Sequence, residues 1–378
     1  MHVRLVDEDS RPSLASRQLL RTIVMTAVLA VLAAGCGGSS DSTTNTESDA
    51  PRVLVTTGIW ADVVANVACG GIADIETIIP VGGDPHGFEP SLRDRERMEN
   101  ADLVVANGLE LELRLEDTLE AVGDSGTTVF EIAENVESIP FSSGQDHGDG
   151  DHGDGDEDHG DEDGDHGDGD EGHGDGDEDH GDGDEGHGDG DEDHGEDAGH
   201  GHGGADPHVW FDPTRVSGVL GELAQHLIDA GVDGDSIAAC LSDYQSELAA
   251  LDQELEDLIG ELPAGKRKLV TNHDALGYFA DRYGFEIIGT VLPSPTTISE
   301  TNPAQLEELA QTIEHEGVGA IFAETVHSSD DAEALASRVG DIKVVTLYTG
   351  SLGPPGSGAE DYIGFMRTNT RLIVDALG

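Results

Sequence analysis

Three histidines of this 378-residue chain stand in local sequences that suit metal binding. His86 and His208 each end an Asp-Pro-His tripeptide, and His273 lies within Asn272-His273-Asp274. Proline fixes the backbone φ before each of the first two rings, and the aspartate can bond a nearby backbone or ring nitrogen. Three imidazoles with one position left for an oxygen form a tetrahedral site that suits Zn²⁺. We therefore expect one tight zinc site formed by His86, His208 and His273.

A second set of histidines lies in a low-complexity tract, residues 146–204. The tract holds 27 acidic residues and no Lys or Arg, and seven of its histidines recur every seven residues. Its repeat lacks apolar residues and is rich in glycine, so we expect a disordered insertion and not a coiled coil. Such a composition favours weak binding of several divalent ions, and a solubilising loop expanded by repeat slippage is the alternative. The histidines of this auxiliary metal loop are His147, His152, His159, His166, His173, His180, His187, His194, His200 and His202.

The charge of the chain excludes one class of partner. The net charge is −62, and −35 remains when residues 146–204 are set aside. Nucleic acid is excluded because phosphate binding needs a basic face, which this composition does not offer. Small cations are attracted instead. A surface adapted to a saline habitat is a coexisting explanation of the acidity.

The N-terminal residues predict export. Arg17 and Arg21 precede an apolar run, residues 23–34, that is too short to span a bilayer and fits a signal peptide over residues 1–35. The sequence Leu32-Ala33-Ala34-Gly35-Cys36 resembles a bacterial lipobox. We therefore expect Cys36 to carry lipid, residues 36–51 to form a flexible tether, and the protein to be extracytoplasmic and anchored to the cell membrane by lipid alone. A plain secreted protein is the alternative.

Two further cysteines, Cys69 and Cys240, have no other assigned role. An exported chain with two free thiols tends to pair them, so we predict a disulfide. Two buried thiols that never meet are the alternative, and the spacing of the two residues does not exclude it.

The remaining sequence alternates short β-branched runs with amphipathic segments, which predicts an α/β fold with parallel sheets. We expect two doubly wound lobes, residues 52–234 with the insertion 146–204, and residues 263–378. Apolar residues at steps of three and four predict one long rigid linker helix over residues 235–262. The expected strands are residues 52–56, 74–80, 102–106, 127–132, 268–272, 286–291, 320–323 and 343–347. The expected helices are residues 59–68, 91–100, 275–283 and 303–315, with further helices from residues 330 and 360.

This arrangement would bring the candidate ligands together at the ends of strands. His273 falls where the strand 268–272 ends, and His86 lies just beyond its own strand. Sheets of this class place ligands at the carboxyl ends of their strands. By the same rule Glu324 and residues 349–351 should face the same interlobe cleft.

Four longer motifs resemble those of the zinc-binding solute receptors of metal ABC transporters, a cluster that also contains manganese and iron receptors. The resemblance covers most of the chain. It implies two lobes joined by a rigid helix, a metal held by His86, His208 and His273, and a membrane permease as partner. It further implies a monomeric receptor that is not an enzyme. The motifs are Gly82 to Ser91, Ala101 to Gly108, Asp206 to Trp210 and Asn272 to Phe279.

One departure from the family leaves the fourth ligand open. Many relatives carry an aspartate ligand in Thr-Asp-Ser, where this chain has Thr349-Gly350-Ser351. We expect Glu324 or water at the fourth position, with His327 and the auxiliary metal loop as alternatives. Loss of that aspartate favours zinc over manganese, because manganese prefers oxygen ligands. Because only neutral imidazole binds metal, zinc affinity should fall as the pH drops through roughly 6 to 5.

Other functions remain open from the sequence. A manganese or iron receptor of the same cluster is the first alternative. A zinc hydrolase, with Glu324 or His327 as the base, would also need three histidines and one open position. A metal buffer or adhesin without a permease is the third.

Overall fold

The computed structural model describes residues 50–378 apart from 142–203, 293, 295 and 341. The expected signal peptide, Cys36, most of the expected tether and the ten histidines of the auxiliary metal loop therefore lie outside the described residues. The described chain belongs to one compact unit, Ala50–Gly378. Among its helices, none combines the length and the apolar character needed to cross a membrane.

The first half of the chain forms a four-stranded parallel sheet with strand order β2-β1-β3-β4. Side chains alternate between its faces: Val53 and Val55 of β1 enter one apolar cluster, and Leu54 enters another. Both faces are thus covered, as a doubly wound lobe requires. The strands are β1 (Arg52–Val55), β2 (Asp74–Thr77), β3 (Leu103–Ala106) and β4 (Val129–Glu131), and the helices are α2 (Gly58–Val67), α3 (Leu92–Glu99) and α4 (Glu116–Asp124).

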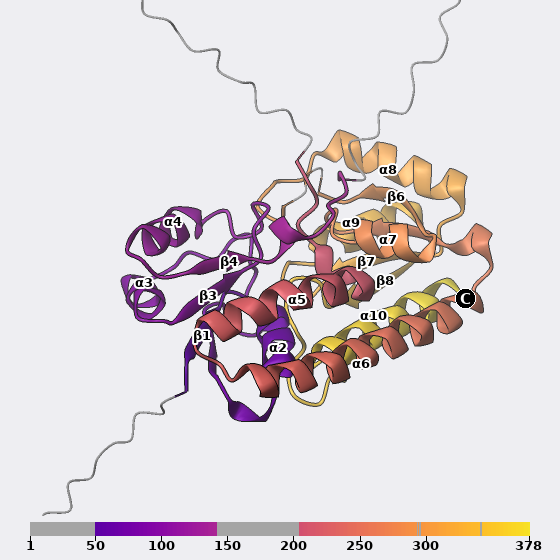
Figure 1. Cartoon of the computed structure of the whole chain (residues 1–378). Helices are drawn as coiled ribbons and strands as arrows, with labels where there is room; N and C mark the ends of the chain where they lie inside the picture. The colour runs from indigo at the N-terminus through magenta and orange to yellow at the C-terminus, as the bar shows by residue number, and fades with distance from the viewer. Residues whose placement is uncertain (1–49, 142–203, 293, 295, 341) are drawn as a thin grey trace, which may run out of the picture. The chain divides into compact units, whose positions relative to one another are not determined.

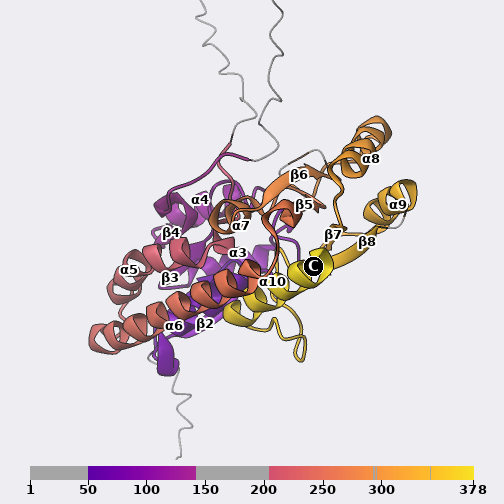
Figure 2. The ribbon, with the colours of Figure 1, turned by 90° about the vertical axis from the view of Figure 1, so that its right-hand side faces the viewer.

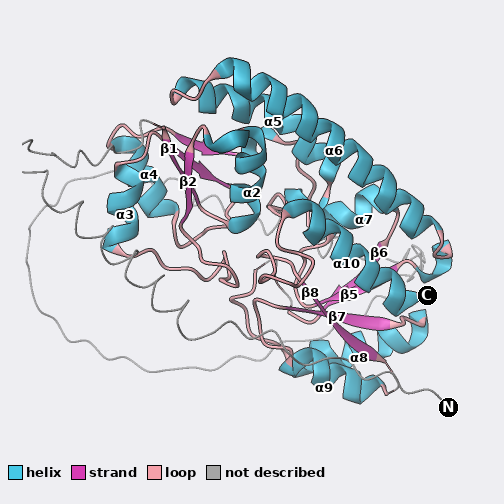
Figure 3. Ribbon diagram, turned by 90° about the horizontal axis from the view of Figure 1, so that it is seen from below, coloured by secondary structure: helices cyan, strands magenta, loops and turns pink. Residues whose placement is uncertain are grey.

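The second half forms another four-stranded parallel sheet, with strand order β6-β5-β7-β8. Leu269 of β5 packs in the same apolar cluster as β1, whereas Val270 packs in a separate cluster on the other face. Figure 3 shows the two sheets as separate groups of strands. The strands are β5 (Lys268–Thr271), β6 (Glu286–Thr290), β7 (Ala320–Glu324) and β8 (Lys343–Leu347), and the helices are α7 (Gly277–Tyr283), α8 (Pro303–Glu316), α9 (Asp330–Val339) and α10 (Tyr362–Leu377). The predicted fold class, two doubly wound α/β lobes, is confirmed.

A long helix, α6 (Gly234–Gly260), connects the two halves. It packs against α5 (Pro213–Asp229) and α2 on the side of the first sheet and against α10 on the side of the second. Figures 1 and 2 show α10 beside the C-terminal part of α6. Residues of both halves share one apolar cluster, which extends from Val53 to Leu377. The buried face of α6 consists of Ile237, Cys240, Tyr244, Leu248, Leu251, Leu255 and Ile259.

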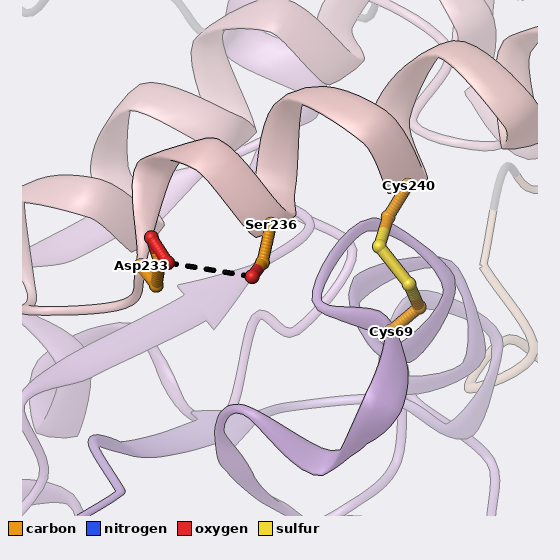
Figure 4. Close-up of a disulfide and its surroundings, with 4 residues drawn as sticks. All are labelled: Cys69, Asp233, Ser236 and Cys240. Atoms are coloured by element: carbon orange, nitrogen blue, oxygen red, sulfur yellow. Dashed lines mark hydrogen bonds between the residues drawn. A yellow bond between two sulfur atoms is a disulfide. The ribbon is translucent and has the colours of Figure 1, made fainter.

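A disulfide attaches α6 to the first half of the chain. It joins Cys240 to Cys69, which lies in the short helix η1 (Cys69–Gly71) directly after α2 (Figure 4). The two Cα atoms are 5.8 Å apart, and the two residues are separated by 171 positions. The long helix is thus tied covalently to the first lobe as well as packed against it.

Candidate metal centre

The rings of His86, His208 and His273 converge on one point. Nε2 of His208 lies 3.2 Å from Nε2 of His86 and 3.2 Å from Nε2 of His273. Two nitrogens bound to one tetrahedral zinc at about 2.0–2.1 Å would lie about 3.3 Å apart, so the spacing suits a shared cation. All three side chains are buried. Among the described residues they form the one group of candidate metal donors close enough to share an ion.

His86 lies in the loop that follows β2. The chain leaves the sheet after Thr77, and Asp84 Oδ1 accepts a hydrogen bond from the backbone N–H of His86 at 3.0 Å. The second carboxylate oxygen of Asp84 accepts from the hydroxyl of Thr297, which belongs to the second half of the chain. Burial and the charges of the other two rings lower the pKa of His86 well below its ordinary value of 6.5. The imidazole therefore stays neutral and able to bind a metal at neutral pH.

His208 precedes the short helix η4 (Val209–Phe211). Oδ1 of Asp206 accepts two hydrogen bonds from it, one from the backbone N–H at 2.9 Å and one from Nδ1 at 2.7 Å. A proton held on Nδ1 leaves the lone pair of Nε2 free for a metal. The ring of Trp210 packs edge-on against the His208 ring, with 5.3 Å between centroids. Burial raises the pKa of Asp206.

His273 follows β5, and Glu324 at the end of β7 holds it. Oε1 of Glu324 accepts from Nδ1 of His273 at 2.5 Å and from its backbone N–H at 3.1 Å. Burial lowers the pKa of His273, but the carboxylate of Glu324, with smaller contributions from Asp84 and Asp274, outweighs burial and holds that pKa above 6.5. Burial would raise the pKa of Glu324, and the His273 ring holds it below its ordinary value instead.

The position of Glu324 differs from the expectation that it supplies the fourth ligand. Its Oε1 bonds His273, and its Oε2 accepts from the hydroxyl of Thr349 at 2.7 Å. It lies behind His273 and outside the group of three Nε2 atoms. His327, the other protein residue considered for that position, also lies outside this group. The carboxylate of Glu324 thus orients the ring of His273, and no further side chain of the described residues joins the group of three.

Sequence reasoning placed Thr349 at the cleft without assigning it a partner, and it missed Thr297. The hydroxyls of Thr297 and Thr349 reach Asp84 and Glu324, respectively, from distant parts of the chain. Thr349 carried a weak signal, because it follows the end of a predicted strand. Thr297 carried none, since it lies in a polar loop between two elements.

An acidic pocket of about 700 Å³ lies beside His86 and is lined by the first half of the chain except for Thr296. Burial and neighbouring carboxylates raise the pKa of Glu116 and of Glu131. Among the described residues that line the pocket there is no Lys or Arg, so the field within it attracts cations. The acidic lining residues are Glu110, Glu112, Glu116, Asp117, Glu120, Glu131 and Glu134.

Comparison with known proteins identifies the family. Residues 53–376 match the family model described as zinc-uptake complex component A, periplasmic. The zinc-binding protein TroA of Treponema pallidum is 28% identical over 334 residues, which cover 86% of this chain and 89% of TroA. The manganese-binding lipoprotein MntA of Halalkalibacterium halodurans is 24% identical over 351 residues, covering 93% and 96%.

Solved structures agree with this match. The structure of periplasmic TroA from Treponema pallidum superposes with a TM-score of 0.64 at 26% identity and covers 87% of this chain and 99% of that one. A manganese-bound periplasmic metal-binding protein from Candidatus Liberibacter asiaticus has the same fold, with a TM-score of 0.65 at 19% identity and coverage of 87% and 100%. The chain therefore belongs to the ZnuA family of substrate-binding receptors of metal ABC transporters.

Proposed function

We propose that this protein captures zinc outside the cytoplasm and delivers it to the permease of an ABC transporter. His86, His208 and His273 would bind the ion, with water or another small ligand in the fourth position. The observation that carries the proposal is the convergence of three buried Nε2 atoms, of which that of His208 lies 3.2 Å from each of the other two. Asp206 and Glu324 support it, because each holds a proton on Nδ1 and leaves Nε2 free.

Manganese is the second candidate, because relatives are named for both metals. The donor set favours zinc. Manganese prefers oxygen-rich coordination, whereas the three atoms that converge here are all imidazole nitrogens. The carboxylates of Asp206 and Glu324 are engaged with the Nδ1 atoms of His208 and His273.

The remaining parts of the chain complete the proposal. Residues 1–35 would be removed as a signal peptide, Cys36 would carry lipid, and residues 36–51 would tether the receptor to the membrane. Residues 52–234 and 263–378 would be the two lobes, with residues 235–262 between them. The auxiliary metal loop within residues 146–204 would gather zinc at several weak sites and raise its concentration beside the tight site.

Competition calorimetry with zinc and manganese tests the proposal. The wild type should bind one zinc ion tightly, and His208→Ala should lose that binding. His315→Ala is the matched control, because His315 lies exposed on α8, far outside the group of three. Manganese bound more tightly than zinc, or a His208→Ala variant with wild-type affinity, would contradict the assignment.

Deletion of residues 146–204 separates the two kinds of site. The variant without residues 146–204 should retain the tight site with wild-type affinity, because the three proposed ligands lie outside the deleted segment. The weaker binding events should disappear from the titration. Loss of the tight site in this variant would mean that the auxiliary metal loop supplies a primary ligand.

A further inference from the structure

The tripeptide Thr349-Gly350-Ser351 follows β8 and contacts the surroundings of all three histidines. Thr349 and Ser351 are buried, although the segment forms a bend and not a strand. Their side chains and backbone meet groups from both halves of the chain. We call these three residues the clasp.

Thr349 contacts the groups that hold His273 and His208. Its hydroxyl donates to Oε2 of Glu324 at 2.7 Å, and the other oxygen of that carboxylate accepts from Nδ1 of His273. Its carbonyl oxygen accepts from Nε1 of Trp210 at 3.1 Å. The ring of Trp210 packs against the ring of His208, so one residue supports two of the three imidazoles.

Ser351 and Gly350 contact the loop that carries His86. The hydroxyl of Ser351 accepts from the backbone N–H of Gly82 at 2.7 Å. Gly350 lies against Pro85, the residue directly before His86. A Cβ atom at position 350 would lie 2.8 Å from Cδ and 3.3 Å from Cγ of the Pro85 ring.

That spacing leaves no room for a side chain. Cδ of proline is bonded to the backbone nitrogen, so it cannot swing aside as the end of a flexible side chain could. The backbone of Gly350 has no positive φ, and the constraint is therefore space alone. Any other residue at this position must displace Pro85, and His86 with it.

We propose that the clasp positions the three imidazoles against one another, and that Gly350 keeps the site a three-nitrogen site by excluding a protein ligand from this side. The inference rests on the proposed function and specifies its substrate class. A site of three imidazole nitrogens selects a cation that completes its coordination with a small ligand, as Zn²⁺ does.

The clasp also joins the two halves of the chain around the site. His86 and His208 come from the first half of the chain, whereas His273, Glu324 and the clasp come from the second. The contacts of the clasp to Gly82, Pro85 and Trp210 therefore link the two halves beside the three rings.

Gly350→Ala in the full-length protein tests the steric part of the proposal. Displacement of Pro85 should weaken zinc binding by tenfold or more, because a small misplacement of one ligand disturbs the whole coordination sphere. The visible spectrum of bound Co²⁺ should change as well, since it reports ligand number and geometry. Gly265→Ala is the matched control: Gly265 also lies in the second half, has no positive φ, and has open space where a Cβ atom would be added.

Gly350→Asp tests the claim about ligands. The added carboxylate should weaken zinc binding and should not improve manganese binding, because its Cβ meets Pro85 before its oxygens can approach the metal. Tighter binding of either metal by Gly350→Asp would overturn the exclusion of a protein ligand.

Thr349→Val and Thr349→Ser test the polar part without adding volume. Loss of the hydroxyl in Thr349→Val should weaken zinc binding about tenfold, at the lower end of the range for outer-shell partners, and Thr349→Ser should restore it. Far-ultraviolet circular dichroism of the metal-free proteins establishes that each variant folds. Wild-type affinity and an unchanged Co²⁺ spectrum in both Gly350→Ala and Thr349→Val would refute the clasp. Failure of the wild type and of Gly265→Ala to bind zinc would instead refute the proposed function.

Discussion

Replacement of Glu324 by glutamine should change both the strength of zinc binding and its dependence on pH. Oε1 of Glu324 lies 2.5 Å from Nδ1 of His273, and the side chain of Glu324 is 2% exposed. Outer-shell partners of metal ligands contribute about 10–100-fold to affinity, which is about 1.4–2.7 kcal/mol. Glutamine keeps the size and can still accept a hydrogen bond, so we expect a loss of about tenfold at pH 8.

The pH dependence follows from the pKa of His273. Glu324 is the main group that holds that pKa above 6.5 against the effect of burial, so the metal-free ring stays protonated to a higher pH than an ordinary histidine. Zinc must displace this proton, and its affinity should fall as the pH drops through a value above 6.5. This is a higher range than the roughly 6 to 5 expected from the sequence. Glu324→Gln removes the interactions that oppose burial most strongly, so the pKa of His273 should fall and the proton that competes with zinc should be bound less tightly.

Zinc titrations of both proteins between pH 5.5 and 8 test this reasoning. The slope of log Kd against pH should be smaller in magnitude by about one for Glu324→Gln between about pH 7 and pH 6. The two curves should therefore approach each other as the pH is lowered. Glu316→Gln is the control, because Glu316 also accepts from a histidine, the exposed His315. Parallel curves for wild type and Glu324→Gln would show that the carboxylate does not govern protonation of His273.

Two further predictions concern the disulfide and the acidic pocket. Cys69→Ser combined with Cys240→Ser should lower the free energy of unfolding by about 5 kcal/mol, because the bond closes a loop over 171 residues. Denaturant titration measures this change, and an unchanged midpoint would contradict it. Glu116→Gln combined with Glu131→Gln should slow zinc association several-fold at low ionic strength and leave dissociation unchanged, because carboxylates beside His86 raise the local cation concentration. Stopped-flow kinetics with a zinc indicator measures both rates, and an association rate that is independent of salt and of these changes would count against the pocket.

The sequence predicted the strands well because each is a short β-branched run between polar turns. Val53 to Val55 and Lys343 to Leu347 are of this kind. Helix α4 escaped prediction, since its sequence is acidic and only Leu119 and Val122 are buried. The strand expected over residues 74–80 ends at Thr77. The prediction was too long because the buried residues Ile78 and Ile79 continue the apolar pattern after the chain has left the sheet.

The site shows where sequence reasoning ends. The rule that ligands gather at strand ends brought His86 and His273 together, but it could not assign partners to the rings. The two Asp-Pro-His tripeptides behave differently: Asp206 bonds the ring of His208, whereas Asp84 bonds only the backbone of His86. The second oxygen of Asp84 bonds the hydroxyl of Thr297, and a partner 213 positions away leaves no trace in a local motif.

The apolar cluster that includes both Val53 and Leu377 has a thermodynamic consequence for a receptor that carries a cation. Because residues from both sheets pack into it, neither half can melt without exposing apolar surface of the other, and heat should unfold the two together. An ion present at a thousand times its Kd adds about 4.1 kcal/mol to the stability of the form that binds it. The stability added by the ion therefore protects α10 and β1 from unfolding as much as it protects the histidines. The metal-free receptor is therefore less stable than the metal-bound receptor throughout the fold, and a protease could distinguish the two forms.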